Sequence, residues 1–302
     1  MAAVGMGTNF PPELVEGMMN LVTGKSSLAK LSARKPIPFT GEKLFTFNLD
    51  KEADIVAENG KKSAGGATVG AVTITPIKFE YSARFSDEFM RADEEYRLRV
   101  LQEFGDGAGR KFARALDLAA FHGVNPRTNQ ASTVVGQNNF DTKVTSQITY
   151  AEATPDDNLD SAIAAITGAE REFNCIAMAP AMASAMAQVD VNGVRQYPEF
   201  RFGGQPDRLA GMAIDINSTV SKMPQSNNSP VMAYVGDFMN MFRWGYATDM
   251  PVEVIEYGNP DNDSSAGDLK GSNQVLLRLE AFIGWAILDP ASFSKIVKAA
   301  EE

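Results

Sequence analysis

Residues 104–112 read FGDGAGRKF. Three glycines alternate in this stretch and two basic residues follow them; these are Gly105, Gly107, Gly109, Arg110 and Lys111. A glycine-rich turn with a basic residue behind it is typical of nucleotide-binding loops, whose backbone amides hold phosphate groups. The interpretation of this stretch decides the fold, because a phosphate loop would indicate a nucleotide-using α/β enzyme.

The residues on both sides of the glycines keep the spacing of one helix. Apolar positions recur at intervals of three and four along Leu98, Leu101, Phe104, Ala108, Phe112, Ala115 and Ala119, which is a single apolar stripe. A phosphate loop follows a strand, and G-x-G-x-G matches neither common phosphate-binding pattern. We therefore predict one helix over 86–122, capped by Ser86 and ended by Gly123. Each glycine weakens it by about 1 kcal/mol relative to alanine.

Composition excludes several classes of function. The 302-residue chain has a net charge of −10, whereas a dedicated nucleic-acid reader carries a basic face. The single cysteine, Cys175, permits no disulfide within one chain, and its apolar surroundings predict a small buried side chain. The single histidine, His122, stands where the helix is expected to end, which favours a capping role over a catalytic one. The sequence contains no run of 18 apolar residues, so it predicts no membrane span.

An acidic stretch near the C-terminus resembles a calcium loop only in part. Asp261, Asp263 and Ser265 occupy the first ligand positions of an EF-hand. The glycine position of that motif holds Ala266, and the closing glutamate position holds Ser272. We therefore predict a mobile surface loop over 258–272 and no metal site. The chain offers no catalytic or cofactor-binding set.

Residues 41–80 are expected to form a long hairpin. Two strand-like segments flank a tip that reads GKKSAGG and is entered through Asn59-Gly60, a strong hairpin-turn signal. The alternation of apolar residues shifts at Pro76. A hairpin of this length has little core of its own, so it is expected to project from the body and to find its partners elsewhere.

The remaining segments complete an α+β chain. Residues 1–34 read as an irregular, solvated arm. Residues 124–235 alternate strand-like and helical segments, and residues 236–302 are rich in strands.

The order of these parts resembles the major capsid protein of tailed bacteriophages, which has the Hong Kong 97-like fold. The stretches that carry the resemblance are PIKFEYSARFSDEFM (76–90), KFARALDLAAFHGV (111–124), RLAGMAIDINSTV (208–220), AYVGDFMNMFRWGYATDMPVEVIEYG (233–258) and QVLLRLEAFIGWAILDPASFSKI (274–296). The resemblance implies an N-terminal arm (1–34) and a peripheral domain (35–123) with an E-loop (41–80) and a spine helix (86–122). An axial domain (124–235) and a second peripheral part (236–302), with the loop 258–272, follow.

The function that the resemblance implies has no active site. Such proteins assemble from hexamers and pentamers into an icosahedral shell around packaged double-stranded DNA, which they contact without sequence specificity. The shell forms in the host cytoplasm and becomes the virion capsid. A portal protein, a separate scaffolding protein and a decoration protein are the other expected partners; a separate scaffold is expected because the sequence begins directly with the arm. Two alternatives stay open: an encapsulin-like nanocompartment with the same fold, and the nucleotide-binding α/β enzyme.

The resemblance also selects residues for contacts between subunits. Some family members join an E-loop lysine to an asparagine of a neighbour, with a glutamate as base. No glutamate clearly accompanies Asn259, Asn262 or Asn273, since Glu256 and Glu280 are only near them in sequence. We therefore expect non-covalent, salt-sensitive contacts, made by Lys61 and Lys62, with Asn59 as a further candidate for contacts between subunits. Arg110 and Lys111 are expected to make intersubunit or solvent contacts. Shells of this family expand as they mature, so the glycines at 105, 107 and 109 are predicted to form a flexure point in the spine helix.

Overall fold

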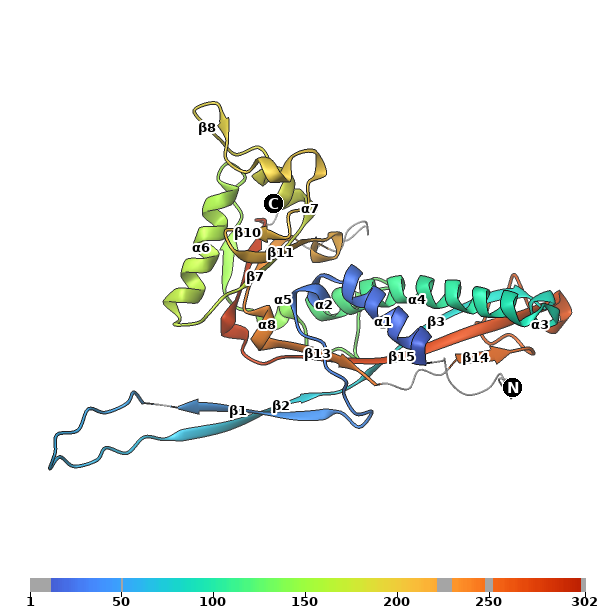
Figure 1. Cartoon of the computed structure of the whole chain (residues 1–302), viewed down its shortest axis with the longest axis horizontal. Coiled ribbons are helices and arrows are strands. Elements are labelled where there is room, and N and C mark those ends of the chain that lie inside the picture. Colours follow the sequence, from blue (N-terminus) through green and yellow to red (C-terminus); the bar gives the residue numbers. More distant parts are fainter. Residues whose placement is uncertain (1–11, 50, 222–229, 248–251, 300–302) are drawn as a thin grey trace.

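The computed structural model describes residues 12–49, 51–221, 230–247 and 252–299. Three parts extend from the middle of the subunit (Figure 1). They are an upright body that contains α6 (Pro155–Gly168), a long body that contains α4 (Glu94–His122), and a projecting hairpin of β1 (Glu42–Leu49) and β2 (Ala67–Ile74). Helices and sheets both contribute to the bodies, so the predicted α+β class is confirmed. No helix of the described residues is long and apolar enough to cross a membrane.

Helix α4 runs unbroken through the glycine-rich stretch, as the spacing predicted. It begins behind the cap Asp93, whose side chain accepts a hydrogen bond from the backbone N–H of Tyr96, and it ends at Gly123, with a φ of 66°. The predicted start at Ser86 is wrong. Ser86 is the last residue of β3 (Ile77–Ser86), and a short helix α3 (Glu88–Arg91) separates this strand from α4. Pairing with a distant strand holds residues 77–86 extended, which overrides the local cap signal.

The long body contains a sheet built around β15 (Gln274–Ile287). Strand β3 pairs antiparallel with one side of β15, while β13 (Phe242–Tyr246) and β14 (Val252–Ile255) pair with the other. Alternate residues of β3 face α4: the ring centroids of Phe79 and Phe112 lie 6.4 Å apart, and those of Tyr81 and Phe104 lie 6.0 Å apart. The apolar stripe of α4 therefore covers one face of this sheet, and β3 is its edge strand among the described residues.

The upright body contains a second sheet, in the order β10-β11-β7-β12-β16-β6 among the described residues. Its strands are β6 (Gln147–Thr149), β7 (Cys175–Met178), β10 (Arg208–Leu209), β11 (Met212–Ile216), β12 (Val231–Gly236) and β16 (Phe293–Val297). The predicted boundary at residue 236 assigned β16 to the other body. That assignment is wrong, because the mostly buried β16 lies between β12 and β6, and the turn at Asp289–Ser292 returns the chain to this sheet.

The described part of the expected irregular arm is helical and packed. Helices α1 (Pro12–Lys25) and α2 (Ser27–Leu31) lie against α4, and Met18, Met19 and Leu28 are at most 1% exposed. A Cβ atom on Gly109 would lie 2.9 Å from the Cγ atom of Met18. Glycine at this position therefore lets α1 and α4 approach closely. Residues 1–11 lie outside the described residues.

The hairpin is present but shorter than predicted. Strands β1 and β2 pair antiparallel, with Glu42 opposite Ile74 at one end and Leu49 opposite Ala67 at the other. The residues after Pro76 belong to β3. The backbone N–H of Gly60 donates to the carbonyl of Ala57 at 2.8 Å, so Glu58 and Asn59 stand in the centre of the turn. Neither Asn59 nor Gly60 has a positive φ. The expected tight Asn-Gly hairpin turn is therefore wrong, and an extended loop joins the two strands.

Short elements fill the connections. They are β4 (Val124–Asn125), β5 (Gln130–Ala131), α5 (Phe140–Lys143), α7 (Pro180–Met186), β8 (Asp190–Val191), β9 (Val194–Arg195), α8 (Phe238–Met241) and the 3₁₀ turns η1 (Pro198–Gly203), η2 (Ser218–Ser221), η3 (Lys270–Ser272) and η4 (Pro290–Ser292).

Candidate intersubunit surfaces

The cysteine lies in a structural, buried position. Cys175 is fully buried on β7. Burial, with a smaller contribution from the charge of Asp237, raises the pKa of its thiol to about 12. The thiolate that a nucleophile needs is therefore suppressed, which fits the predicted role of a small buried hydrophobic residue.

The histidine is the last residue of α4, as expected, but its ring contacts other elements. Its Nδ1 atom lies 2.8 Å from Oδ2 of Asp141, and its Nε2 atom lies 2.9 Å from the carbonyl oxygen of Thr219. Burial opposes ionisation of Asp141, but hydrogen bonds from His122 and Tyr234 outweigh it and lower the pKa of that carboxyl. His122 therefore joins α4 to η2 and α5.

A buried carboxylate that sequence reasoning missed holds the arm. Asp117 is fully buried on α4 and accepts hydrogen bonds from the side chains of Ser26 and Thr219, at 2.5 and 2.7 Å. It also accepts from the backbone N–H groups of Ser27 and Leu28 at the start of α2, at 2.9 and 3.2 Å. Burial raises its pKa to about 6 although these bonds oppose the shift. The detectable signal was a lone acid inside the apolar run ALDLAAF.

The acidic loop is held by an arginine. The guanidinium of Arg84 donates to both carboxylate oxygens of Asp261, at 2.5 and 2.8 Å, and to Oδ1 of Asn259 at 2.7 Å. The hydrogen bond to Arg84 lowers the pKa of Asp261 to about 2. This network fixes the loop to β3, contrary to the predicted mobile loop over 258–272. In the described ranges, no group of three or more His, Cys, Asp or Glu side chains could hold a metal ion.

Two of the residues named for cross-linking chemistry, Asn259 and Glu280, are engaged elsewhere. Asn259 binds Arg84, and the carboxylate of Glu280 lies 2.5 Å from the ammonium of Lys78.

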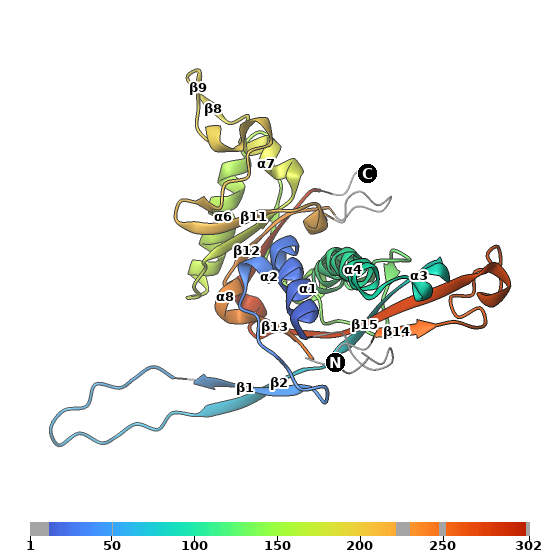
Figure 2. The same ribbon diagram turned by 45° about the vertical axis from the view of Figure 1, so that its right-hand side comes forward.

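The predicted contact residues lie on two separate surfaces. Asn59, Lys61 and Lys62 are exposed in the loop of the hairpin, and Arg110 and Lys111 are exposed on α4. Figures 1 and 2 both place this loop far from α4, at the outer end of the projecting hairpin. A single subunit therefore does not bring these residues together.

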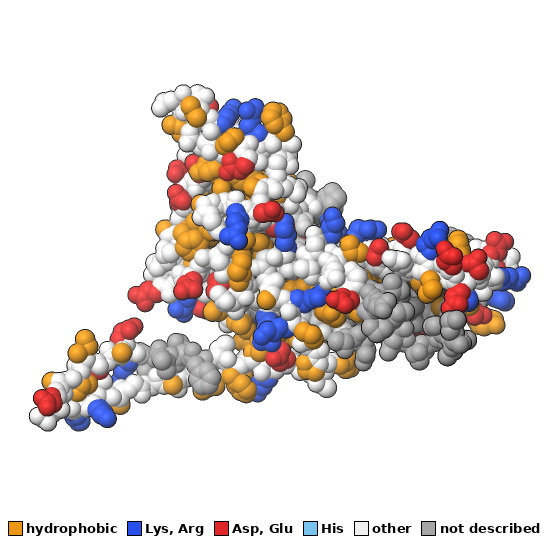
Figure 3. Space-filling model, viewed as in Figure 1, with side chains coloured by type: hydrophobic (Ala, Val, Ile, Leu, Met, Phe, Trp, Pro, Cys, Tyr) orange, Lys and Arg blue, Asp and Glu red, His pale blue; other side chains and the backbone are white. Residues whose placement is uncertain are grey.

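The hairpin exposes apolar side chains. Phe45 and Val69 are 63% and 56% exposed, and Ile55, in the loop, is 99% exposed. Leu44, Val72 and Ile74 point to the other face and pack near Ile37. Figure 3 shows hydrophobic, acidic and basic side chains mixed at the end of the hairpin. Contiguous exposed apolar surface is typical of interaction sites, so the hairpin is a candidate contact surface.

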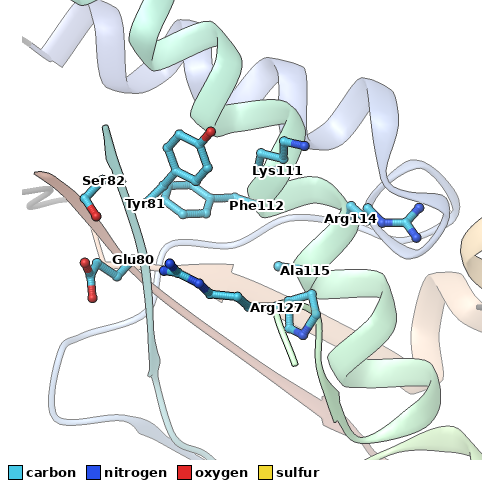
Figure 4. Close-up of a pocket in the computed structure, with 9 residues that line it drawn as sticks. Glu80, Tyr81, Ser82, Lys111, Phe112, Arg114, Ala115 and Arg127 are labelled. Carbon is cyan, nitrogen blue, oxygen red and sulfur yellow. The ribbon is translucent and has the colours of Figure 1, made fainter. Parts of the chain in front are cut away.

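A cavity of about 450 Å³ lies between β3 and α4 (Figure 4). Among its lining residues, only Lys111 was selected from the sequence as a contact residue. The residues that line it are Glu80, Tyr81, Ser82, Lys111, Phe112, Arg114, Ala115, Pro126 and Arg127. Arg110 does not line this cavity.

Comparisons with known proteins agree on one family. The model of the phage capsid family matches residues 7–298. A solved structure from Mycobacterium phage Ogopogo is 30% identical, with a TM-score of 0.74, over 91% of this chain and 92% of that chain. One from Gordonia phage Cozz is 25% identical, with a TM-score of 0.73, over 92% of this chain and 87% of that chain.

A more distant structure shares the fold. The capsid of an empty GTA particle is 19% identical, with a TM-score of 0.64, over 91% of this chain and 90% of that chain. No curated protein matches the sequence. The family match over nearly the whole chain and the two phage structures lead to one conclusion: the chain belongs to the phage capsid family.

Proposed function

We propose that this chain is the major capsid protein of a tailed phage and assembles into hexamers and pentamers of an icosahedral shell around packaged double-stranded DNA. The observation that carries the proposal is the projecting hairpin, which exposes apolar residues on a segment with no core of its own. Burying such residues against a second copy removes apolar surface from water, which favours assembly. The family and the related phage structures support the same function.

The net charge of −10 agrees with a shell that holds DNA without gripping it. An acidic inner wall does not neutralise phosphates, so DNA can pack densely beside it. We propose a portal protein, a separate scaffolding protein and a decoration protein as further partners, with assembly in the host cytoplasm and the virion capsid as the final location.

Electron microscopy of the purified protein tests this function. Icosahedral particles are expected, and particles purified from infected cells should contain double-stranded DNA. Particles that enclose a protein cargo instead of DNA would favour an encapsulin-like compartment, and a protein that never assembles would contradict a shell function.

Deleting residues 59–66 is expected to leave a folded subunit and to weaken the capsomers. These residues are exposed and form no strand, so the subunit loses no core, whereas contacts with a neighbour are lost. Circular dichroism and size-exclusion chromatography measure folding and assembly. A normal yield of particles from the deleted chain would contradict the role of the hairpin.

Lys61 and Lys62 are expected to make non-covalent contacts. A denaturing gel of mature particles should show one band at 32.6 kDa, and particles should loosen as salt screens the lysine charges. A ladder at multiples of that mass would show covalent joining and overturn this expectation.

We propose that the glycines of α4 permit bending during shell expansion, although two of them differ in packing. A Cβ on Gly107 meets nothing within 4 Å, so Gly107→Ala is expected to stabilise the subunit by up to about 1 kcal/mol and to slow expansion. A Cβ on Gly109 would lie 3.1 Å from the Met18 carbonyl oxygen, so Gly109→Ala is expected to destabilise it by about 1 kcal/mol. Urea unfolding and time-resolved light scattering measure both effects. Normal expansion of Gly107→Ala shells would remove the flexure role.

A further inference from the structure

We propose that the ring of His122 is a proton-dependent latch between the two bodies of the subunit. The ring holds both η2 and α5 on the end of α4 only while each of its nitrogens faces its partner through a hydrogen, so loss of one proton releases one contact. The latch is a property of the folded subunit and does not depend on assembly into a shell. It gives a role to the single histidine of the chain.

Both ring nitrogens of His122 face oxygen atoms that accept hydrogen bonds. Nδ1 lies 2.8 Å from Oδ2 of Asp141, and Nε2 lies 2.9 Å from the carbonyl oxygen of Thr219. A neutral imidazole has one N–H group and one lone pair, so it can donate to only one of these oxygens. The other nitrogen would direct its lone pair at an oxygen within hydrogen-bond distance. The two contacts together therefore require one proton more than a neutral ring and a carboxylate contain.

The additional proton resides on the ring, because its surroundings keep Asp141 ionised. Oδ1 of Asp141 accepts from the hydroxyl of Tyr234 at 2.5 Å, and the ammonium of Lys295 donates to the backbone carbonyl of Asp141 at 2.8 Å. Burial opposes ionisation of Asp141, but the hydrogen bonds from His122 and Tyr234 and the nearby positive charges lower its pKa. Burial raises the pKa of Tyr234 well above its usual value, so this hydroxyl remains a donor. His122 is therefore an imidazolium paired with a carboxylate.

The two contacts of the ring connect different bodies. His122 is the last residue of α4, which belongs to the long body. The turn η2 follows β11, and α5 precedes β6; both strands belong to the sheet of the upright body. Figure 1 places α5 where the two bodies meet. The side chain of His122 has no exposed surface, so bulk water cannot replace a contact that the ring loses.

Thr219 connects the latch to a second buried acid. Its hydroxyl donates to Oδ2 of Asp117 at 2.7 Å, while its carbonyl oxygen accepts from the ring of His122. Release of Thr219 from the ring is therefore expected to disturb a hydrogen bond of Asp117 as well. The titratable groups around the ring are Asp141 on α5, Tyr234 on β12, Lys295 on β16 and, through Thr219, Asp117 on α4.

The contact to η2 is the one that the neutral ring is expected to lose. An ionised carboxylate accepts a stronger hydrogen bond than a peptide carbonyl does, so the remaining hydrogen should stay on Nδ1 and point at Asp141. Nε2 then presents a lone pair to the carbonyl oxygen of Thr219, and the two atoms repel each other. Helix α5 is also held by the buried ring of Phe140, whereas η2 has no aromatic ring of its own. Release should therefore appear in η2.

Nitrogen NMR of the full-length chain labelled with ¹⁵N-histidine tests the protons directly, because the spectrum contains only His122. At about pH 6 both ring nitrogens of the folded chain are expected to carry a hydrogen, although burial alone would favour a neutral ring. As the pH is raised, the hydrogen on Nε2 should be lost first. A folded chain whose ring has one hydrogen at about pH 6, or whose ring loses the Nδ1 hydrogen first, would overturn the proposal.

Hydrogen exchange tests the release of η2. The backbone N–H of Val220 donates to the carbonyl of Asn217 at 3.3 Å, so its exchange reports opening of this turn. After correction for the intrinsic rate at each pH, exchange of Val220 is expected to rise about tenfold as the ring loses its proton. Leu277, which is paired on β15 between β3 and β14, should not respond.

Two variants without a titratable ring serve as controls for this pH dependence. In His122→Asn and His122→Gln, the corrected exchange rate of Val220 should no longer change as the parent ring does. Asp117 titrates in all three chains, so the difference between them reports the ring alone. Equal pH dependence of Val220 in the parent and both variants, or an equal rise at Leu277, would overturn the proposal. The nitrogen spectrum of the parent needs no variant and decides the question if neither variant folds.

Discussion

Replacing Asp117 with alanine is expected to lower the free energy of unfolding of the subunit by about 3–4 kcal/mol. The carboxylate is fully buried and accepts hydrogen bonds from α2 and η2. Alanine removes the acceptor and leaves these donors without water or another partner. The hydroxyls of Ser26 and Thr219 can rotate towards other acceptors, but the backbone N–H groups of Ser27 and Leu28 cannot.

Asparagine is expected to rescue only part of this loss. Its amide oxygen can accept on one side, but its amide nitrogen then faces either the Ser27 or the Leu28 N–H group, and two donors cannot bond to each other. Urea unfolding of dissociated subunits measures the free energies. Glu103→Ala is the control, because Glu103 is an exposed acid on the same helix and should change stability by less than about 0.5 kcal/mol. Equal stability of Asp117→Ala and Glu103→Ala would contradict a stabilising role for the hydrogen bonds that Asp117 accepts.

The same carboxyl group gives the stability a pH dependence with a definite sign. Burial raises the pKa of Asp117 from 3.8 to about 6 in the folded subunit. Between these values the folded state binds more protons than the unfolded state, so this group makes stability fall as pH rises from about 4 to about 6. The contribution is about 2–3 kcal/mol. The parent should therefore lose more stability than Asp117→Ala across this window, and equal slopes would show that Asp117 does not titrate there.

The sequence predicted elements whose signals are local. The apolar spacing around Phe104 and Phe112 identified a helix across the glycines because each turn of a helix repeats the pattern. It missed the start of that helix, since residues 77–86 are held extended by β15, about two hundred residues away. The same reason explains β16, which a division by sequence position placed in the wrong body although it pairs with β12.

The sites depend still more on distant contacts. Asp117 accepts hydrogen bonds from Ser26, which is 91 residues away, and from Thr219, which is 102 residues away. No local sequence pattern therefore indicates these bonds. The cavity beside β3 is lined by three separate segments, and sequence reasoning selected only one of the lining residues, Lys111, as a contact residue. Two long strand-like segments with little core of their own did indicate a projecting hairpin, although the Asn-Gly turn signal between them was wrong.

Replacing Phe140 with alanine is expected to lower the free energy of unfolding by about 3–5 kcal/mol. Phe140 is fully buried, and its ring lies within 5.6 Å, centroid to centroid, of five other rings. These rings are Phe121, Tyr234, Phe238, Phe242 and Phe293. They come from α4, β12, α8, β13 and β16, so the cluster lies where both sheets meet the long helix. Leucine fills more of the space and should cost less, about 1–2 kcal/mol.

Phe202 provides a matched control for the same change. It is 97% exposed, so Phe202→Ala should alter the free energy of unfolding by less than about 0.5 kcal/mol. Urea unfolding of both variants compares one chemical change at a buried and an exposed site. Because Phe140 contacts strands of both sheets, its loss is also expected to speed hydrogen exchange in β12 and β13 together. Faster exchange in only one of these strands would show that the aromatic cluster belongs to one sheet and does not couple the two bodies.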